Sequence, residues 1–388
     1  MSKTYKFPKD FFWGAATASY QVEGGIYNND WAKAAEDGFV PLAGSGGDHY
    51  KQYESDFDLA KSIGHNCHRL SIEWSRIEPE EGKFDMKEIE HYRKVLQSLN
   101  EKGLTPFVTL WHFTLPLWFV EKKGFEKKEN IKYFSRYCEF VVKNLKEECK
   151  HWATCNEPMV FASNGWLRGQ WPPFKIGRFL MIWTVVNNLA KAHRHTYKIL
   201  KKESPDSDIG VVKNNIYFHV HKGFFNKFRA RFMDWFWNRR FLKKVDRHCD
   251  SLGINYYFHS EYGNGEKKYP KSDMGWDLYP EGLYHVLMGV KGFGKGVYVS
   301  EAGLADERDK NRAWYIRGLV ESMGRALEDG VKLEGYMYWS LMDNYEWSFG
   351  FEKRFGLIEI DYNTKERRIR NSAYEFEKIC RSGELVVK

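Results

Sequence analysis

Short apolar runs alternate along the chain with longer stretches in which apolar residues recur at helical spacing. The runs are rich in β-branched and aromatic residues, a composition typical of β-strands. We expect eight strands, at 11–15, 68–72, 106–110, 151–155, 209–212, 251–257, 296–300 and 334–340. Among the segments between them, we expect helices at 48–63, 86–101, 128–146 and 185–201. Eight strands, each followed by a crossover, predict an α/β fold, a closed (β/α)8 TIM barrel.

A length of 388 residues is compatible with two ordinary domains or with one barrel carrying insertions. No Pro/Ser-rich stretch, long charge run, repeat or low-complexity segment marks a linker, so we expect a single catalytic domain over 1–388. The apolar content of 43% supports a large core. Aromatic residues make up 17% of the chain, and an excess of Trp and Tyr suits flat ligands such as sugar faces.

The charge is mildly basic, +8 from 60 basic and 52 acidic residues that alternate along the chain. This favours a solvated surface over nucleic-acid binding. The six cysteines have no CxxC spacing, which favours free thiols in a reducing compartment. The first ten residues lack a signal-peptide core, and the longest apolar stretch, 179–186, is too short to span a bilayer. We therefore expect a soluble, cytoplasmic protein.

Two glutamates each follow or end an apolar strand-like run: Glu157 in the string 154–158 and Glu301 in the string 299–303. Their separation corresponds to about three βα units, so a barrel would bring both to the carboxyl ends of its strands. Pro158 pushes the backbone of Glu157 toward an extended conformation. A pair of carboxyl groups from separate strands is what glycosidic bond cleavage requires. The alternative for each glutamate is a buried ion pair with arginine.

A series of motifs in this chain resembles glycoside hydrolase family 1, the retaining β-glycosidases. The resemblance covers residues 11–362 and is carried by the segments Phe11–Gly24, Arg69–Ile77, Trp111–Phe113, Asn156–Pro158, Gly253–Tyr257, Val299–Glu301, Trp339–Trp347 and Lys353–Gly356.

The resemblance implies roles for four residues. Glu301 matches the nucleophile, a carboxylate that forms a covalent glycosyl-enzyme. Glu157 matches the acid/base, whose proton affinity the anion at Glu301 raises. Arg69 and Tyr257 match the cation and the hydroxyl that accompany the nucleophile.

The resemblance also implies a set of sugar-binding residues. Asn156 matches the group that bonds the 2-hydroxyl, and the aromatic floor under the ring corresponds to Trp339 and Trp347. The further candidates are Gln21, His112, Asn255, Glu346 and Phe355.

This chain departs from the family pattern at the nucleophile, where Ala302 replaces the usual Asn. Phe113 stands beside His112 where many members have Trp, and the chain is shorter than most members, which implies trimmed loops and an open aglycone site. Relatives that cleave 6-phosphosugars carry a Ser seven residues before the Lys of their Lys-Arg-Tyr segment. Here that position is Glu346 and the segment ends in Phe355, which indicates a neutral sugar.

Two segments admit other interpretations. His219 and His221 would face one side of a strand, but no third metal ligand is evident, so we expect neither a metal nor a cofactor. Segment 224–242 interleaves aromatic and basic residues in a way typical of membrane-surface or nucleic-acid patches. It also resembles a family segment, and we favour packing with solvated charge over a peripheral membrane contact.

The function predicted is that of a retaining exo-β-glycosidase acting on small β-linked glucosides, galactosides or oligosaccharides, with no nucleic-acid partner. One alternative, suggested by Ala302, is a catalytically weak carbohydrate-binding protein on the same barrel. Another is a transglycosylase that transfers the sugar to acceptors other than water. The sequence favours no particular oligomeric state.

Overall fold

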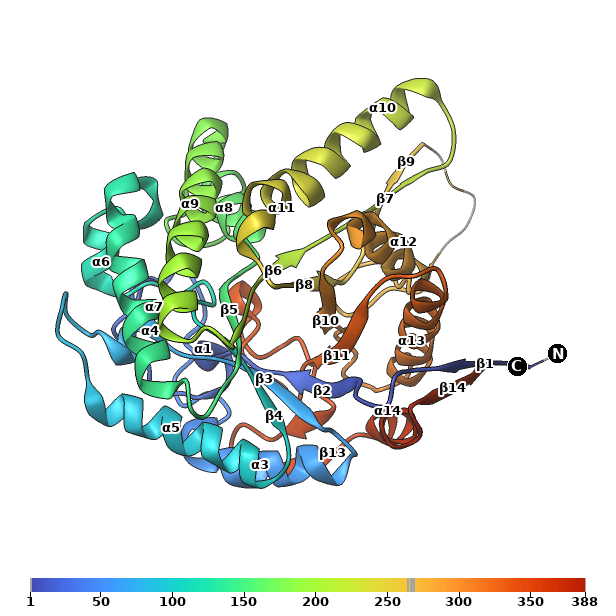
Figure 1. Ribbon diagram of the computed structural model, residues 1–388, viewed down its shortest axis with the longest axis horizontal. Coiled ribbons are helices and arrows are strands. Elements are labelled where there is room, and N and C mark those ends of the chain that lie inside the picture. The colour runs from blue at the N-terminus through green and yellow to red at the C-terminus, as the bar shows by residue number, and fades with distance from the viewer. Residues whose placement is uncertain (1, 264, 266–268, 388) are drawn as a thin grey trace.

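The computed structural model describes residues 2–263, 265 and 269–387. At its centre, eight parallel strands close into a barrel in the order β10-β11-β2-β3-β4-β5-β6-β8, with helices around the outside (Figure 1). These strands are β2 (Phe12–Ala16), β3 (Cys67–Ser71), β4 (Thr105–Thr109), β5 (His151–Asn156), β6 (Asp208–Asn214), β8 (Ser251–Tyr256), β10 (Gly296–Ala302) and β11 (Leu333–Trp339).

The prediction of a TIM barrel is confirmed, and each of its strands lies within two residues of the expected bounds. The reason the strands were visible in the sequence is their burial. In β3 and β8, for example, every residue is buried, because one face of the strand packs inside the barrel and the other packs against helices. Strands covered on both faces appear in a sequence as continuous apolar runs.

The longer helices lie outside the barrel. They are α3 (His49–Ser62), α5 (Met86–Glu101), α7 (Ile131–Leu145), α9 (Phe179–Glu203), α12 (Glu281–Val290), α13 (Arg312–Glu328) and α14 (Asn371–Ser382). α9 begins six residues earlier than expected, because exposed apolar residues in its first turns hide the helical period.

Shorter helices fill the connections. They are α1 (Ser19–Val22), α2 (Asp30–Glu36), α4 (Trp74–Ile77), α6 (Leu117–Glu121), α8 (Pro158–Trp166), η1 (Gly124–Glu126), η2 (Lys128–Asn130), η4 (Asp246–His248), η5 (Lys291–Phe293) and η6 (Trp347–Phe349).

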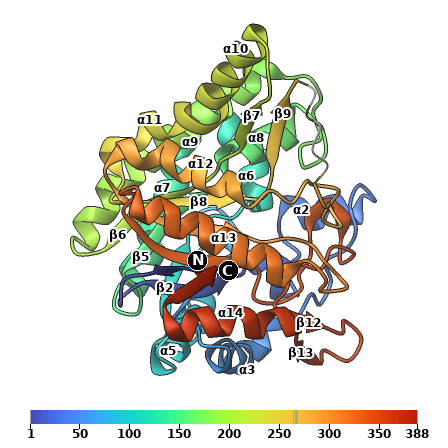
Figure 2. The same cartoon turned by 90° about the vertical axis from the view of Figure 1, so that its right-hand side faces the viewer.

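One helical arm projects from the barrel after β6. It consists of α10 (Phe224–Met233), the π-helical segment η3 (Asp234–Arg239) and α11 (Arg240–Val245). In both views α10 reaches the outer edge of the molecule (Figures 1 and 2). The parallel pair β7 (Tyr217–Val220) and β9 (His259–Tyr262) packs beside α10, and β7 leads into the outer end of that helix.

Two further strand pairs lie outside the barrel, and the sequence did not predict them because they are short and partly exposed. β1 (Lys3–Lys6) pairs antiparallel with β14 (Glu384–Val387), which brings the two chain ends side by side (Figure 1). β12 (Ile358–Ile360) pairs antiparallel with β13 (Arg367–Ile369).

All six cysteines are free, as predicted, and five of them are buried. Among the residues that the structure describes, none of the helices combines the length and the apolar character that crossing a bilayer requires.

A buried carboxylate ties the loop after β11 to the C-terminal part of the chain. Asp343 is fully buried and accepts two hydrogen bonds from the guanidinium of Arg370, both at 2.9 Å. It also accepts from the backbone N–H of Gly356 at 2.9 Å and from Arg354 at 3.3 Å. Removing one partner of such a pair leaves the other charge buried without compensation.

We therefore expect Asp343→Ala to lower the free energy of unfolding by about 3–5 kcal/mol, because Arg370 stays buried without its partner. The measurement is equilibrium unfolding in denaturant. Glu366→Ala is the matched control. Glu366 also pairs with an arginine, Arg368 at 3.0 Å in the β12–β13 hairpin, but both of these side chains are more than half exposed. That control should cost less than about 1 kcal/mol. Equal losses for the two variants would contradict a structural role of Asp343.

Candidate active site

A cavity of about 960 Å³ opens at the carboxyl ends of the barrel strands. The predicted site residues that line it are Gln21, His112, Asn156, Glu157, Tyr257, Glu301, Trp339, Glu346, Trp347 and Phe355. The other two predicted residues, Arg69 and Asn255, do not line the cavity but hydrogen-bond to carboxylates that do. The fold thus brings together residues that are far apart in the sequence.

Glu301 lies near the carboxyl end of β10 and is buried. Its Oε1 accepts a hydrogen bond from the guanidinium of Arg69, and its Oε2 accepts one from the hydroxyl of Tyr257 at 2.6 Å. A buried cation and a hydroxyl donor both favour the ionised form of a carboxyl group. Glu301 is therefore held as an anion at a fixed place in the cavity wall.

The Arg69 guanidinium links four barrel strands. From β3 it donates to the hydroxyl of Thr109 on β4 at 3.1 Å and to Oδ1 of Asn156 on β5 at 2.9 Å. It also donates to the backbone carbonyl of Ser300 on β10 at 3.2 Å, next to its bond with Glu301. Because the planar guanidinium has donors in fixed directions, it sets the relative positions of these groups.

Glu157 lies directly between β5 and α8, and its backbone differs from the sequence expectation. With φ 44° and ψ 61° it is left-handed, not extended. Pro158 disfavours the right-handed helical conformation for the residue before it, and the chain turns from strand to helix within this one residue. A left-handed glutamate is unusual and is found where the surroundings impose it. Here the Glu157 N–H donates to the carbonyl of Val212 at 3.0 Å.

The Glu157 carboxyl group has only one strong partner among the described residues, the side-chain amide of Asn255, which donates to its Oε1 at 2.7 Å. Burial raises the pKa of Glu157 well above its usual 4.5, and the negative charge of Glu301 raises it further. Burial and the Glu301 carboxylate thus favour the protonated form of Glu157, whereas Glu301 has a cation and a hydroxyl donor as partners. The two carboxyl groups therefore have unlike surroundings.

Lys213 is a buried cation near Glu157 that the sequence analysis missed. It lies on β6, is fully buried, and burial lowers its pKa to about 7, against the opposing influence of Glu157. Its ammonium group donates to the carbonyl of Asn214 and lies 5.4 Å from the ring centroid of Trp237. The sequence signal was a lysine directly after Val211 and Val212, inside an apolar strand.

Asn156 and His112 form a hydrogen-bonded pair beside the carboxylates. Their side chains lie 3.3 Å apart, from Asn156 Nδ2 to His112 Nε2. Burial lowers the pKa of His112 well below its usual value, and Arg69 lowers it further, so the imidazole is neutral. The His112 ring lies nearly parallel to the rings of Trp339 and Trp347, at centroid distances of 6.0 and 6.1 Å.

Gln21 and Glu346 present unsatisfied polar atoms at the cavity. The amide of Gln21 donates to Asn344 Oδ1 at 2.9 Å and to the Tyr345 carbonyl at 2.8 Å, which leaves its own oxygen without a partner among the described residues. Glu346 Oε2 also lacks a partner there. Because buried polar atoms are nearly always satisfied, such atoms at a cavity wall indicate contacts to a polar ligand.

Glu346 is a candidate for binding sugar hydroxyl groups, and its pKa differs from that of an ordinary ionised glutamate. Burial raises its pKa from 4.5 to about 8, with further contributions from Glu301 and Glu157. At neutral pH the group is thus a neutral acid that can both donate and accept a hydrogen bond. The cavity holds three carboxyl groups. The donors around Glu301 favour its charged form, whereas burial favours the protonated forms of Glu157 and Glu346.

Asn255 differs from its predicted place among the sugar contacts. It is fully buried behind the cavity, where its amide donates to Glu157 and its carbonyl oxygen accepts from the hydroxyl of Ser300 at 2.7 Å. It therefore positions the Glu157 carboxyl group. Ala302, the departure from the family pattern, is buried in the apolar core, and its backbone carbonyl accepts from Tyr336 at 3.0 Å.

His219 and His221 have a carboxylate neighbour that the sequence analysis did not identify. Glu261 lies opposite His219 in the β7–β9 pair, and its Oε1 is 2.8 Å from His221 Nε2 and 3.9 Å from His219 Nδ1. The three side chains could hold a cation, as could His259, Glu261 and Asp277. None of these residues lines the cavity that contains Glu157 and Glu301, so the cluster is separate from these two glutamates.

Comparisons with known proteins place this arrangement in a family. The model of glycosyl hydrolase family 1 matches residues 3–245 and 240–384. The chain belongs to glycosyl hydrolase family 1. It is therefore a glycoside hydrolase, and the resemblance found in the sequence is confirmed.

Several family 1 relatives match over nearly their whole length. A 1,4-beta-D-glucan glucohydrolase of Thermotoga neapolitana is 34% identical over 98% of this chain and 99% of its own. A beta-glycosidase from Pyrococcus horikoshii is 38% identical, with a TM-score of 0.93 over 99% of this chain and 96% of its own. A Thermotoga maritima beta-glucosidase in complex with glucoimidazole is 31% identical, with a TM-score of 0.92 over 97% and 99%.

The alignment to the Thermotoga neapolitana protein has 441 positions, more than the 388 residues of this chain, so this chain lacks residues at some of them. The chain is thus shorter than that relative, as the sequence analysis predicted for most members. The two family matches overlap at 240–245, within α11.

The raised pKa of Glu346 predicts how stability depends on pH. Between pH 4.5 and about 8 the folded state keeps a proton on Glu346 that the unfolded chain has lost. Stability therefore falls as pH rises through this window, by about 1.4 kcal/mol per pH unit for one such group. Glu157 acts in the same direction. We expect Glu346→Gln to remove part of this slope, measured as the free energy of unfolding from pH 5 to 8.

Glu366→Gln is the control, because Glu366 is exposed and its replacement should leave the slope unchanged. A slope in Glu346→Gln equal to that of the wild type would contradict the raised pKa.

Proposed function

We propose that this chain is a retaining exo-β-glycosidase that hydrolyses small β-linked glucosides and galactosides through a covalent glycosyl-enzyme, with residues 1–388 as one catalytic domain. The observation that carries the proposal is the unlike surroundings of Glu157 and Glu301 in one cavity. Arg69 and Tyr257 donate to Glu301, whereas Glu157 is buried beside it with a raised pKa. Such pairs supply one nucleophile and one acid.

In the first step the Glu301 carboxylate attacks the anomeric carbon and forms a glycosyl ester. Glu157 gives its proton to the glycosidic oxygen, and the aglycone leaves as an alcohol. In the second step Glu157, now an anion, takes a proton from water, whose oxygen attacks the anomeric carbon and releases Glu301. Two displacements at one carbon retain its configuration.

The coupling between the two glutamates lets Glu157 serve both steps. While Glu301 is an anion, it raises the pKa of Glu157 and keeps the proton available for the leaving oxygen. The ester is neutral, so this contribution disappears in the intermediate and Glu157 becomes a better base toward water. Tyr257 and Arg69 stabilise the Glu301 carboxylate when it leaves again.

The sugar would bind between polar groups and aromatic rings. Asn156 lines the cavity with its oxygen held by Arg69 and its Nδ2 beside His112, and it suits the 2-hydroxyl, a contact that strengthens in the transition state. Trp339 and Trp347 offer flat surfaces to the ring. Support comes from the relatives, since one is named as a glucohydrolase of 1,4-beta-D-glucan and another was solved with glucoimidazole.

A neutral sugar fits this cavity better than a 6-phosphosugar. Gln21 and Glu346 each carry an unsatisfied oxygen at the cavity, which suits neutral hydroxyl groups. The cavity already holds Glu301 as an anion, with Glu157 and Glu346 beside it, and a phosphate dianion in a partly dry pocket would face these groups. Gln21 and Glu346 can bond either epimer of a 4-hydroxyl, so both glucosides and galactosides should react.

Replacing the nucleophile tests the mechanism. We expect Glu301→Ala to lower turnover of 4-nitrophenyl β-glucoside by about 10⁴-fold or more, because no covalent intermediate can form. Azide should restore cleavage and give the inverted α-glycosyl azide. The exposed Glu359→Ala is the control and should keep wild-type turnover. Near-normal turnover of Glu301→Ala would assign the nucleophile elsewhere.

Glu157→Ala tests the acid/base. A good leaving group needs no acid, so we expect a burst of nitrophenol followed by slow turnover, with azide accelerating the second phase. A crystal structure should give a carboxyl separation of about 5–5.5 Å between Glu157 and Glu301 in the wild type. A separation of about 8 Å or more would contradict retention.

Substrate comparison tests the sugar class. The specificity constant for 4-nitrophenyl β-glucoside should exceed that for its 6-phosphate, because the phosphate would face the carboxyl groups. A higher constant for the phosphorylated substrate would refute the neutral-sugar proposal. The same assays separate the alternatives, since a carbohydrate-binding protein gives no nitrophenol, and a transglycosylase gives sugar products linked to added acceptors instead of free sugar.

A further inference from the structure

Large apolar side chains are exposed on two helical segments beside the cavity. They are Ile176 just before α9, Phe179, Leu180 and Trp183 in its first turns, Phe224, Phe225, Phe228 and Phe232 in α10, and Trp235 in η3. Leu180 is 87% exposed and Phe224 81%. Clusters of this kind are rare on proteins that have no partner. We call this set the α9–α10 face.

The two segments are joined by contacts between side chains. The rings of Trp183 and Phe236 stack at 6.5 Å, and those of Phe236 and Phe232 at 6.1 Å. The Arg240 guanidinium lies 3.1 Å from the centroid of the Trp183 ring. The N-terminal end of α9 and the whole of α10 also reach the same side of the molecule in Figure 1. The two segments therefore meet at Trp183, Phe236 and Arg240.

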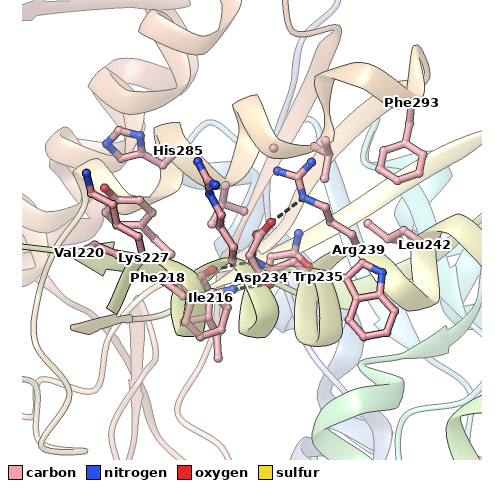
Figure 3. A pocket seen from close by; sticks show the side chains of 18 residues that line it. Ile216, Phe218, Val220, Lys227, Asp234, Trp235, Arg239, Leu242, His285 and Phe293 are labelled. Carbon is pink, nitrogen blue, oxygen red and sulfur yellow. Dashed lines mark hydrogen bonds and ion pairs between the residues drawn. The ribbon is translucent and has the colours of Figure 1, made fainter. Parts of the chain in front are cut away.

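α10 leaves four large apolar side chains unpacked on its outer side. A cavity of about 530 Å³ lies under α10 and η3, and the polar Lys227, Arg231, Asp234 and Asn238 line it (Figure 3). The phenylalanines at 224, 225, 228 and 232 line neither this cavity nor the catalytic one and point into solvent. The outer side of α10 thus carries the exposed phenylalanines, and Lys227 and Arg231, at the edge of the cavity, are exposed as well.

The charges around the face are mostly positive. Segments 175–184 and 222–235 contain six basic residues and one acidic residue, Asp234, which pairs with Arg239. The basic residues are Lys175, Arg178, Lys222, Lys227, Arg229 and Arg231. Aromatic rings on one side of a helix with Lys and Arg beside them are typical of helices that lie in a membrane interface. Such residues attract anionic headgroups.

We propose that the α9–α10 face docks on the surface of an anionic lipid bilayer, with its aromatic side chains at the headgroup level and its basic residues against lipid phosphates. A second copy of the chain fits less well, because a symmetric contact would bring the same basic residues of both copies together. The proposal reverses the preference for plain packing only for the first part of segment 224–242, where Phe224, Phe225, Phe228 and Phe232 are exposed, whereas Phe236 and Phe241 pack on the core.

The position of the face connects it to the catalytic cavity. Met233 and Trp237, on the next side of the same arm, line the cavity that contains Glu157 and Glu301. Docking would therefore hold the mouth of the cavity beside the lipid surface. The proposal does not depend on the proposed reaction, because binding to vesicles is measured without hydrolysis.

The test is flotation of the full chain with vesicles made of equal parts phosphatidylcholine and phosphatidylglycerol. We expect the wild type to float with them, and to float much less with phosphatidylcholine alone or at high salt, which screens the basic residues. In the triple variant Phe225→Ser, Phe228→Ser, Phe232→Ser the partition coefficient should fall by about a hundredfold or more, because three aromatic side chains no longer enter the interface.

A control variant, Met86→Ser, Trp314→Ser, Tyr374→Ser, removes three exposed large side chains outside the face and should float like the wild type. Both triple variants should keep the wild-type melting temperature and turnover of a small nitrophenyl glycoside. The proposal is overturned if the wild type does not float, or if the phenylalanine variant floats as the wild type does. A dimer in light scattering that the phenylalanine variant abolishes would instead assign the face to a second copy.

Discussion

The active site depends on one buried cation, the guanidinium of Arg69. Its donors bond to groups on β4, β5 and β10, so the nucleophile candidate Glu301 and the amide of Asn156 share one rigid support. A buried carboxylate without such a partner would be protonated or would destabilise the fold. The barrel makes the arrangement possible because parallel strands end at one rim, and each strand supplies one or two groups to the site.

The rest of the site is built from groups that are unfavourable for the fold. Glu157 adopts a left-handed backbone, and Glu157 and Glu346 are carboxyl groups that burial keeps protonated. Lys213 is a lysine whose burial opposes its charge. Each of these is expected where a protein maintains reactive groups in a dry cavity at the expense of stability. The barrel tolerates them because its core is large and its strands are buried over most of their length.

The sequence predicted the barrel and ten of the residues that line its cavity, for reasons that the structure explains. Strands buried on both faces give continuous apolar runs, and the motifs around Glu157 and Glu301 are local in the chain. It did not predict contacts between distant segments. Asn255 is placed behind Glu157 by the register of β8, and Glu261 meets His221 only through the β7–β9 pair. The early start of α9 was hidden because its first apolar residues face solvent.

The pairing of β1 with β14 makes the chain nearly circular. Lys3 lies opposite Val387, and Phe7 donates its backbone N–H to Gly383 at 2.9 Å, so each end completes the backbone hydrogen bonds of the other. Tyr5 is buried in the core from this strand. In most proteins fraying begins independently at each terminus. Here the two ends should fray together, since neither strand can detach without exposing the edge of its partner strand.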